Sequence, residues 1–379
     1  FFKLNLHFLF FIFLAAGIFS TIFNIRNYYK YFNTSSNLKN FIFFLSCLLA
    51  ICVMISSEPI LSWDGIAHWY YKALNYHQGG SYEDLKNLPF AYYPHLGGYI
   101  WSFFWTNSLL NLEYFGRFFY IFIFLSSIFS ATDRLDKKIS LYFKIIITLI
   151  FVIFATDKFI LGGYQEYFLF YLFYSFSFVL YQVQKSKKNS YLEYFLIISS
   201  VLLMFWVKQE GFFYVIILTI VLFFFIQKEI YKRFVLLAFF LISLYFFTQL
   251  KIYFHGNFSF NEEIFHSGLM RYLDFKTLLF SLFNITVEIL KAFIKYPLWI
   301  IITLVLAITF LKNKIVKDIN LIFYIFYLGF IYAIYLQTSM EMDQLMPLTL
   351  DRVLFHGTGF YLMVIVNFIN EELCKSINS

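Results

Sequence analysis

Long apolar stretches recur along the whole chain and constrain its fold more than any other feature. A helix needs about 20 apolar residues to cross a bilayer, within a range of about 17 to 25. Because 61% of the residues are hydrophobic and only 13% are charged, a soluble protein of this length could not bury the apolar surface. We therefore expect an all-α fold, a single polytopic transmembrane helical bundle over residues 1–379 with about eleven spans. The expected spans are 4–23, 41–57, 114–131, 139–156, 164–182, 191–207, 211–226, 233–250, 297–311, 321–337 and 353–370.

Lysine and arginine predict the orientation of these spans. Five of the connecting loops hold 15 Lys or Arg in 46 residues, whereas the loops on the opposite side hold 10 in 128. Basic residues gather on the cytoplasmic side of membrane proteins, so the net charge of +7 fits topology better than nucleic-acid binding. We expect a multi-pass protein of the bacterial inner membrane. The cytoplasmic loops would be 24–40, 132–138, 183–190, 227–233 and 312–318.

This orientation requires two apolar stretches to stay at the membrane interface. Stretch 97–112 lies in the first outer loop, 58–113, and is rich in Trp and Tyr, which favour the headgroup level. Stretch 277–295 lies in the outer loop 251–296 and places polar residues at helical spacing against apolar ones. Both stretches predict interfacial helices.

Cysteines and the chain start carry less information. Cys47 and Cys52 lie in one apolar stretch and Cys374 in the tail, so no disulfide or zinc spacing occurs. Residue 1 is Phe rather than Met, and we expect the N-terminal end to be incomplete, with a further helix possible before it.

The first outer loop, with "LSWDGIAHWYYKALNYH" near its start, concentrates ionisable groups among aromatic ones. Asp64, His68 and Lys72 are four residues apart and share a face if 62–76 is a helix. One interpretation is an interfacial helix with a solvated polar stripe. Another is a metal site, in which Asp64, His68 and His95 meet. A third is a catalytic pocket, because several ionisable groups on one membrane face favour a shared polar cavity.

Three further polar patches lie at the outer ends of apolar spans. Glu166 follows Gly162 and Gly163, where a glycine turn and a helix-dipole role both fit. Lys208 and Glu210 interrupt two spans, as a salt-bridged hairpin turn would. Arg352 precedes His356 by four residues, and it could cap a helix or bind a phosphate.

Taken in order, these four patches resemble the GT-C superfamily of integral membrane glycosyltransferases, which use polyprenyl-phosphate sugars and include relatives of protein mannosyltransferases and aminoarabinose transferases. The chain departs from the family pattern at Gln165-Glu166, where Ala-Asp is usual, and at Val207 and Gln209, where Thr and Asn are usual. The pieces that carry the resemblance are "WDGIAHWYYKA" with "YPHLGGYIW", "GGYQEYFLFYLFY", "WVKQEG" and "TLDRVLFH" in the last outer loop, 338–352 and beyond.

The resemblance implies transfer of a sugar on the outer face of the membrane. Asp64 would be the general base and Glu166 would hold the acceptor, or a divalent metal if one is used. The lipid-phosphate leaving group would be stabilised by Lys208, Arg352 and His356. The remaining substrate-binding residues would be His68, Lys72 and His95, the first two orienting Asp64 or contacting the phosphate.

The expected partners are a polyprenyl-phosphate-linked sugar, membrane lipid, and a glycan, lipid or protein acceptor. This interpretation requires no cofactor, although a divalent metal is compatible with it. Three alternatives remain open. A transporter or flippase of lipid-linked saccharides would place polar groups at mid-bilayer. A ligase or polymerase would use a long late loop such as 251–276. A purely structural membrane protein would not need Asp64, Lys208 and Arg352 to converge.

Overall fold

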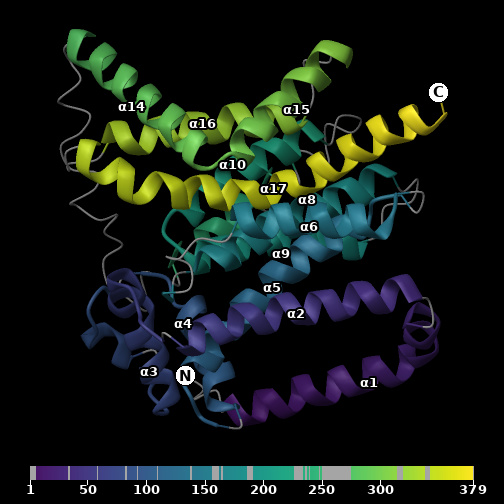
Figure 1. Cartoon of the computed structure of the whole chain (residues 1–379). Coiled ribbons are helices and arrows are strands. Elements are labelled where there is room, and N and C mark those ends of the chain that lie inside the picture. The colour runs from purple at the N-terminus through teal and green to yellow at the C-terminus, as the bar shows by residue number, and fades with distance from the viewer. Residues whose placement is uncertain are drawn as a thin grey trace. The chain divides into compact units, whose positions relative to one another are not determined.

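A computed structural model describes most of the chain, and its regular elements are all helical (Figure 1). This confirms the all-α fold for the part of the chain that is described. The described residues are 6–32, 35–57, 59–81, 83–91, 93–108, 110–136, 139–155, 162–163, 165–185, 191–225, 234, 237–238, 240–246, 248–249, 275–313, 319–337 and 342–378.

Ten of the predicted spans coincide with helices. The eleventh, 233–250, is described only in part, and its described residues have helical backbone. The ten are α1 (Leu6–Phe32), α2 (Ser35–Ser57), α5 (Tyr114–Thr132), α6 (Leu141–Ala155), α8 (Glu166–Lys185), α9 (Tyr191–Val207), α10 (Gly211–Phe225), α15 (Leu298–Asn313), α16 (Ile319–Gln337) and α17 (Met342–Asn378).

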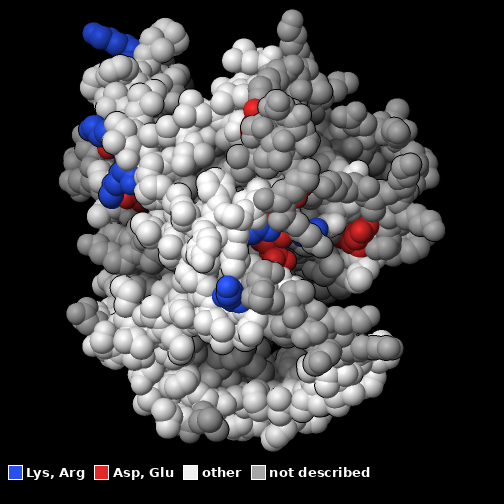
Figure 2. All heavy atoms as spheres, turned by 45° about the vertical axis from the view of Figure 1, so that its right-hand side comes forward, with Lys and Arg blue, Asp and Glu red and all other residues white. Residues whose placement is uncertain are grey.

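Length and composition identify a multi-pass membrane protein. Among the described residues, five helices are long and apolar enough to cross a bilayer: α2, α5, α16, α17 and α14 (Phe275–Lys295). Several shorter apolar helices accompany them. Large apolar side chains such as Phe19 and Phe23 are 72% and 80% exposed, which suits lipid contact. On the face shown in Figure 2, Lys, Arg, Asp and Glu occupy only small patches.

Helix α14 has three distinct faces. Ser281, Ile285, Ile289 and Ala292 form its buried face. Polar residues follow along one side, with Glu288 and Lys291 in an ion pair, and apolar residues on the other side are exposed. Its length also qualifies it as a span, so the interfacial position of 277–295 stays a prediction.

The chain divides into two compact units, residues 1–168 (unit 1) and 169–379 (unit 2). In unit 1, α5 packs against α2 and α6 and against α4 (Leu96–Thr106). Helix α4 in turn packs against α3 (Tyr71–His77). The predicted interfacial stretch 97–112 thus contains a short helix of 11 residues that lies on α3 and α5.

In unit 2, α10 packs against α9 and α16, while α17 packs against α14, α15 and α16 (Figure 1). Aromatic rings fill this core. Phe323 stacks on Phe360 with ring centroids 4.0 Å apart, and Tyr327 stacks on Tyr214 and Trp299 at 5.9 and 5.8 Å. Aromatic pairs of this kind stabilise the fold beyond the contribution of the apolar area that they bury.

One prediction about the last outer loop is wrong. Residues 342–352 were expected in a loop, but α17 begins at Met342 and carries Asp351 and Arg352 in its helical part. Charge marked this segment as a loop, but part of that charge is compensated, because the exposed Lys295 of α14 forms an ion pair with Asp351. Pro347 lies within the helix, near its start.

Candidate functional site

The segment around Asp64 is helical from Trp63 to His77, with a π-helical turn η1 (Gly65–Tyr70) that continues into α3. The predicted sharing of one face therefore holds for Asp64 and His68. Oδ1 of Asp64 lies 4.0 Å from Nε2 of His68, and the Asp64 side chain is 23% exposed. A carboxylate that is partly exposed beside a buried imidazole can still accept a proton from a substrate.

Aromatic rings surround His68. Its imidazole stacks on Tyr93 at 3.9 Å between ring centroids and meets the edge of Phe90 at 4.4 Å. Trp63 completes the surroundings at 5.7 Å and is itself exposed. These contacts hold the imidazole in place next to Asp64.

Lys72 is buried, and its ammonium donates hydrogen bonds to the backbone of the turn at residues 90–93, whose rings pack against His68. Nζ donates to the carbonyl oxygens of Phe90 at 3.0 Å and Tyr93 at 2.8 Å. Phe90 has a φ of +53°, a region that a bulky side chain adopts at a cost. The hydrogen bonds from Lys72 stabilise this strained turn. Lys72 was predicted either to orient Asp64 or to contact the phosphate, and these contacts support the first role.

The first two sequence motifs meet in unit 1 through backbone contact. The carbonyl of Gly162 accepts hydrogen bonds from both the N–H and the hydroxyl of Ser62, each at 3.0 Å. A Cβ on Gly65 would collide with the same carbonyl, and Gly163 has a φ of +93° that favours glycine. The glycine turn is therefore fixed against the segment that carries Asp64. Glu166 follows this turn as the first residue of α8 and is buried.

Helix α4 is attached to the same turn. His95 is buried immediately before α4, and its carbonyl accepts the N–H of Tyr99 at 2.9 Å. Gly97 lies directly against the side chain of Gln165, and the hydroxyl of Tyr120 donates to the Gly97 carbonyl at 2.6 Å. Close approach at Gly97 thus brings the His95 region to the start of α8.

Sequence reasoning missed a buried ion pair in unit 1. Arg117 pairs with Glu113 at 3.0 Å and also donates to the carbonyls of Pro59 and Ile60, each at 3.4 Å. Burial raises the pKa of the Glu113 carboxyl, and Arg117 opposes this rise. An arginine inside an apolar span, four residues after an acid, was the available signal. The pair anchors the chain just before Asp64.

In unit 2, Lys208 and Glu210 form the ion pair that their spacing allowed. Nζ of Lys208 lies 3.3 Å from Oε1 of Glu210 in the break between α9 and α10. Burial acts to raise the pKa of Glu210, but the charge of Lys208, a backbone hydrogen bond and the charge of Arg352 together outweigh it, and the net pKa is lowered. Gly211 permits the break, because a Cβ there would collide with the carbonyl of Met204.

The third and fourth motifs also meet within unit 2. Lys208 and Arg352 both act electrostatically on the buried His356, and Nδ1 of His356 lies 2.8 Å from the hydroxyl of Tyr214. Two cations, one carboxylate and one imidazole are thereby grouped with a net positive charge. Such a group can bind a phosphate through charge-assisted hydrogen bonds.

Aromatic side chains that the sequence reasoning did not single out hold α17 at this point. The hydroxyl of Tyr327 donates to the carbonyl of Val353 at 2.6 Å, and Nε1 of Trp299 donates to that of Leu354 at 2.8 Å. Gly357 leaves the space that both rings occupy. These bonds position Arg352 and His356 on either side of the two carbonyls.

The metal interpretation gains no support from the described residues, in which no three His, Cys, Asp or Glu side chains gather as a metal would require. Residues 251–274 of the outer loop 251–296 lie outside the described residues. Comparisons with known protein families, curated proteins and solved structures found no match for this chain. The structure groups the four motifs in two pairs, one in each unit, and convergence of all four stays a prediction.

Proposed function

We propose that the protein is a membrane glycosyltransferase that moves a sugar from a polyprenyl-phosphate donor to an acceptor hydroxyl on the outer face of the bacterial inner membrane. The observation that carries the proposal is the cluster of Lys208, Glu210, Arg352 and His356 (cation cluster), assembled in unit 2 from two motifs far apart in sequence. Two cations, of which Lys208 is buried and Arg352 is half-buried, accompany one carboxylate in an otherwise apolar protein, and an anionic ligand would balance the excess positive charge.

In the proposed reaction, the Asp64 carboxylate takes the proton of the acceptor hydroxyl while its oxygen attacks the anomeric carbon. The bond between that carbon and the phosphate oxygen breaks, and its electron pair leaves with the polyprenyl phosphate. Direct displacement inverts the anomeric centre. Lys208 and Arg352 stabilise the charge that grows on the phosphate, and His356 assists as a hydrogen-bond donor.

The surrounding residues support these roles. His68 orients Asp64, and Lys72 holds the turn at 90–93 over His68. Glu166 and His95 would bind the acceptor near the glycine turn. Exposed aromatic side chains such as Trp63 would contact the sugar or the lipid surface.

Transfer can be tested with a panel of polyprenyl-phosphate sugars carrying labelled hexoses or pentoses, and membranes as acceptor. Asp64→Asn is expected to abolish transfer, because the amide cannot accept the proton. The matched control is Asp84→Asn, an acid in the same outer loop that bonds Ser81. Full transfer by Asp64→Asn would remove Asp64 as the base.

Donor binding is measured separately, with polyprenyl phosphate itself as the probe. Lys208→Gln and Arg352→Gln should each weaken binding about tenfold, since each removes one charge-assisted hydrogen bond. Lys291→Gln, on the exposed side of α14, is the control. Equal binding by all three variants would show that the cation cluster does not bind the phosphate.

The proposed orientation has its own test. Cysteines placed at positions 77 and 187 should be labelled by an impermeant reagent from outside and from inside, respectively. The opposite pattern would place the Asp64 segment in the cytoplasm and contradict the proposal.

A further inference from the structure

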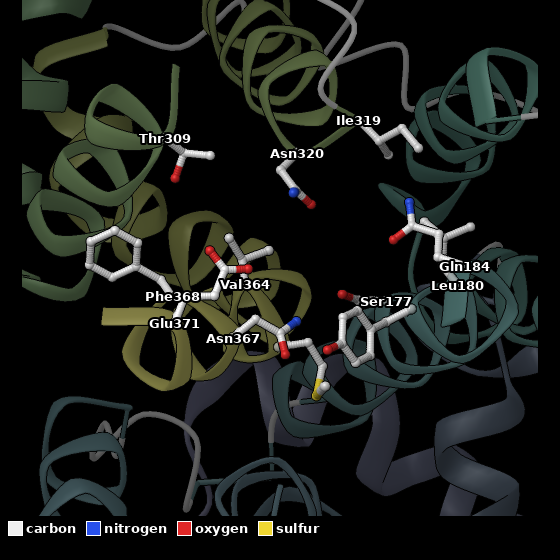
Figure 3. A pocket seen from close by; sticks show the side chains of 12 residues that line it. Ser177, Leu180, Gln184, Thr309, Ile319, Asn320, Val364, Asn367, Phe368 and Glu371 are labelled. Atoms are coloured by element: carbon white, nitrogen blue, oxygen red, sulfur yellow. The ribbon is translucent and has the colours of Figure 1, made fainter. Parts of the chain in front are cut away.

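A polar cavity lies in unit 2, away from the cation cluster. Its volume is about 190 Å³, and it is formed where α8, α15 and α17 end and α16 begins (Figure 3). The hydrogen-bonding residues in its wall include Ser177, Tyr181, Gln184, Asn320, Asn367 and Glu371. None of these takes part in the proposed sugar transfer.

Charge and chemistry of the wall define the ligand. Among the described lining residues, Glu371 is acidic and none is basic, so an anion would be disfavoured there. Amide and hydroxyl oxygens of Asn320, Asn367 and Ser177 add hydrogen-bond acceptors, and Figure 3 shows the two asparagines directed into the opening. Phe368 and Tyr181 supply aromatic rings that favour a cation.

Asn320 is the second residue of α16, and Thr309 lies in the last turns of α15, so the cavity lies at one end of these apolar helices. The headgroup of a lipid lies at such an end of a membrane helix, where its ammonium can enter the cavity while its phosphate stays outside. The cavity has room for the volume of about six waters, which is enough for such a group.

We propose that this cavity binds the primary ammonium of a zwitterionic lipid headgroup of the phosphatidylethanolamine type. The carboxylate of Glu371 and the amide oxygens accept the N–H groups of the ammonium, while the phosphate stays at the membrane surface. A hydrogen bond holds the wall together, because the hydroxyl of Tyr361 donates to the carbonyl of Asn320 at 3.1 Å. The membrane side, cytoplasmic, follows from the proposed orientation, whereas the ligand chemistry does not depend on it.

Native mass spectrometry of the full chain with defined lipids tests the inference. Phosphatidylethanolamine should be retained about fivefold more than phosphatidylcholine of the same acyl chains, because trimethylation removes every N–H donor. Glu371→Gln should lower this preference, and so should Asn367→Leu. Glu371 is exposed, so its replacement does not endanger folding.

The control is Glu288→Gln, which makes the same charge change on α14, away from the cavity. Equal retention of the two lipids by the unaltered chain would overturn the proposal. So would a preference that survives both Glu371→Gln and Asn367→Leu. Soluble O-phosphoethanolamine is added as a competitor, and binding of this compound without any lipid preference would overturn the assignment to a lipid.

Discussion

Unit 1 holds Asp64 by close backbone contact, whereas unit 2 holds Arg352 and His356 by hydroxyl groups and charges. In unit 1 the carbonyl of Gly162 meets Ser62 and Gly65 at distances that admit no Cβ. In unit 2 the corresponding contacts come from side chains of Tyr214, Tyr327 and Lys208. The segment around Asp64 should therefore be damaged chiefly by added atoms, whereas the surroundings of Arg352 and His356 should also be damaged by the removal of polar groups.

The largest effect is expected for Gly65→Ala. Its methyl group would collide with the Gly162 carbonyl, and a backbone atom cannot move aside as a flexible side chain can. Overpacking of this kind should cost about 3 kcal/mol of stability. Thermal unfolding of the purified chain measures the loss, and hydrogen exchange locates it in unit 1. Gly17→Ala and Gly329→Ala, which meet nothing within 4 Å, should leave stability nearly unchanged.

Next in size is Lys208→Met, which leaves Glu210 without its closest cation in a buried setting. We expect a loss of about 2 kcal/mol, below the value for a fully buried pair because the Glu210 side chain is 30% exposed. Lys291→Met breaks the exposed pair with Glu288 and should cost less than about 0.5 kcal/mol. Equal losses in the same unfolding assay would show that burial does not distinguish the two pairs.

Tyr214→Phe should have a smaller effect on stability, about 1 kcal/mol, because one buried hydrogen bond to His356 is lost while the ring contacts remain. Tyr120→Phe removes the bond to the Gly97 carbonyl in unit 1 and should cost a similar amount. Polyprenyl-phosphate binding distinguishes the two variants, because Tyr214→Phe should weaken this binding and Tyr120→Phe should not. A loss of binding in both would mean that the hydroxyl groups act only through folding.

Acidification should give the smallest effect, and it should reach the segment around His77 before it reaches the carboxylate of Glu210. Burial lowers the pKa of His77 below its ordinary 6.5, so the stability that its neutral form contributes is present above pH 6.5 and is lost as the pH falls through the folded pKa. The net pKa of Glu210 is lowered from 4.5, so its contribution is present above pH 4.5 and is lost only below that.

Hydrogen exchange at stepped pH would follow this order through peptides that cover His77 and Glu210. His77→Gln should remove the early step, since glutamine does not titrate in this range. If the early step persisted in His77→Gln, the assignment of that step to His77 would be contradicted.

Much of the fold could be predicted because it depends on local properties of the chain. Apolar length placed helices at ten of the eleven predicted spans, and the four-residue spacing of Asp64 and His68 anticipated their contact. The spacing of Lys208 and Glu210 anticipated their ion pair. Each of these features involves residues that are neighbours in sequence, so periodicity and composition suffice to find them.

Features that depend on distant partners could not be predicted in this way. Nothing near Lys72 in sequence indicates that its ammonium holds the carbonyls of Phe90 and Tyr93. The helical start of α17 was mistaken for a loop because the charge of Asp351 is compensated by Lys295 from another helix. Tyr327 and Trp299 looked like ordinary core residues until their bonds to α17 were seen.

Membrane class, helical content and the positions of the spans follow from the residues in their order, since transfer of an apolar segment into lipid depends on that segment alone. The pairing of motifs within each unit, the strained turn over His68 and the cation cluster required the folded chain. These arise from contacts between residues far apart in sequence, and their energy depends on geometry and burial that no local pattern encodes.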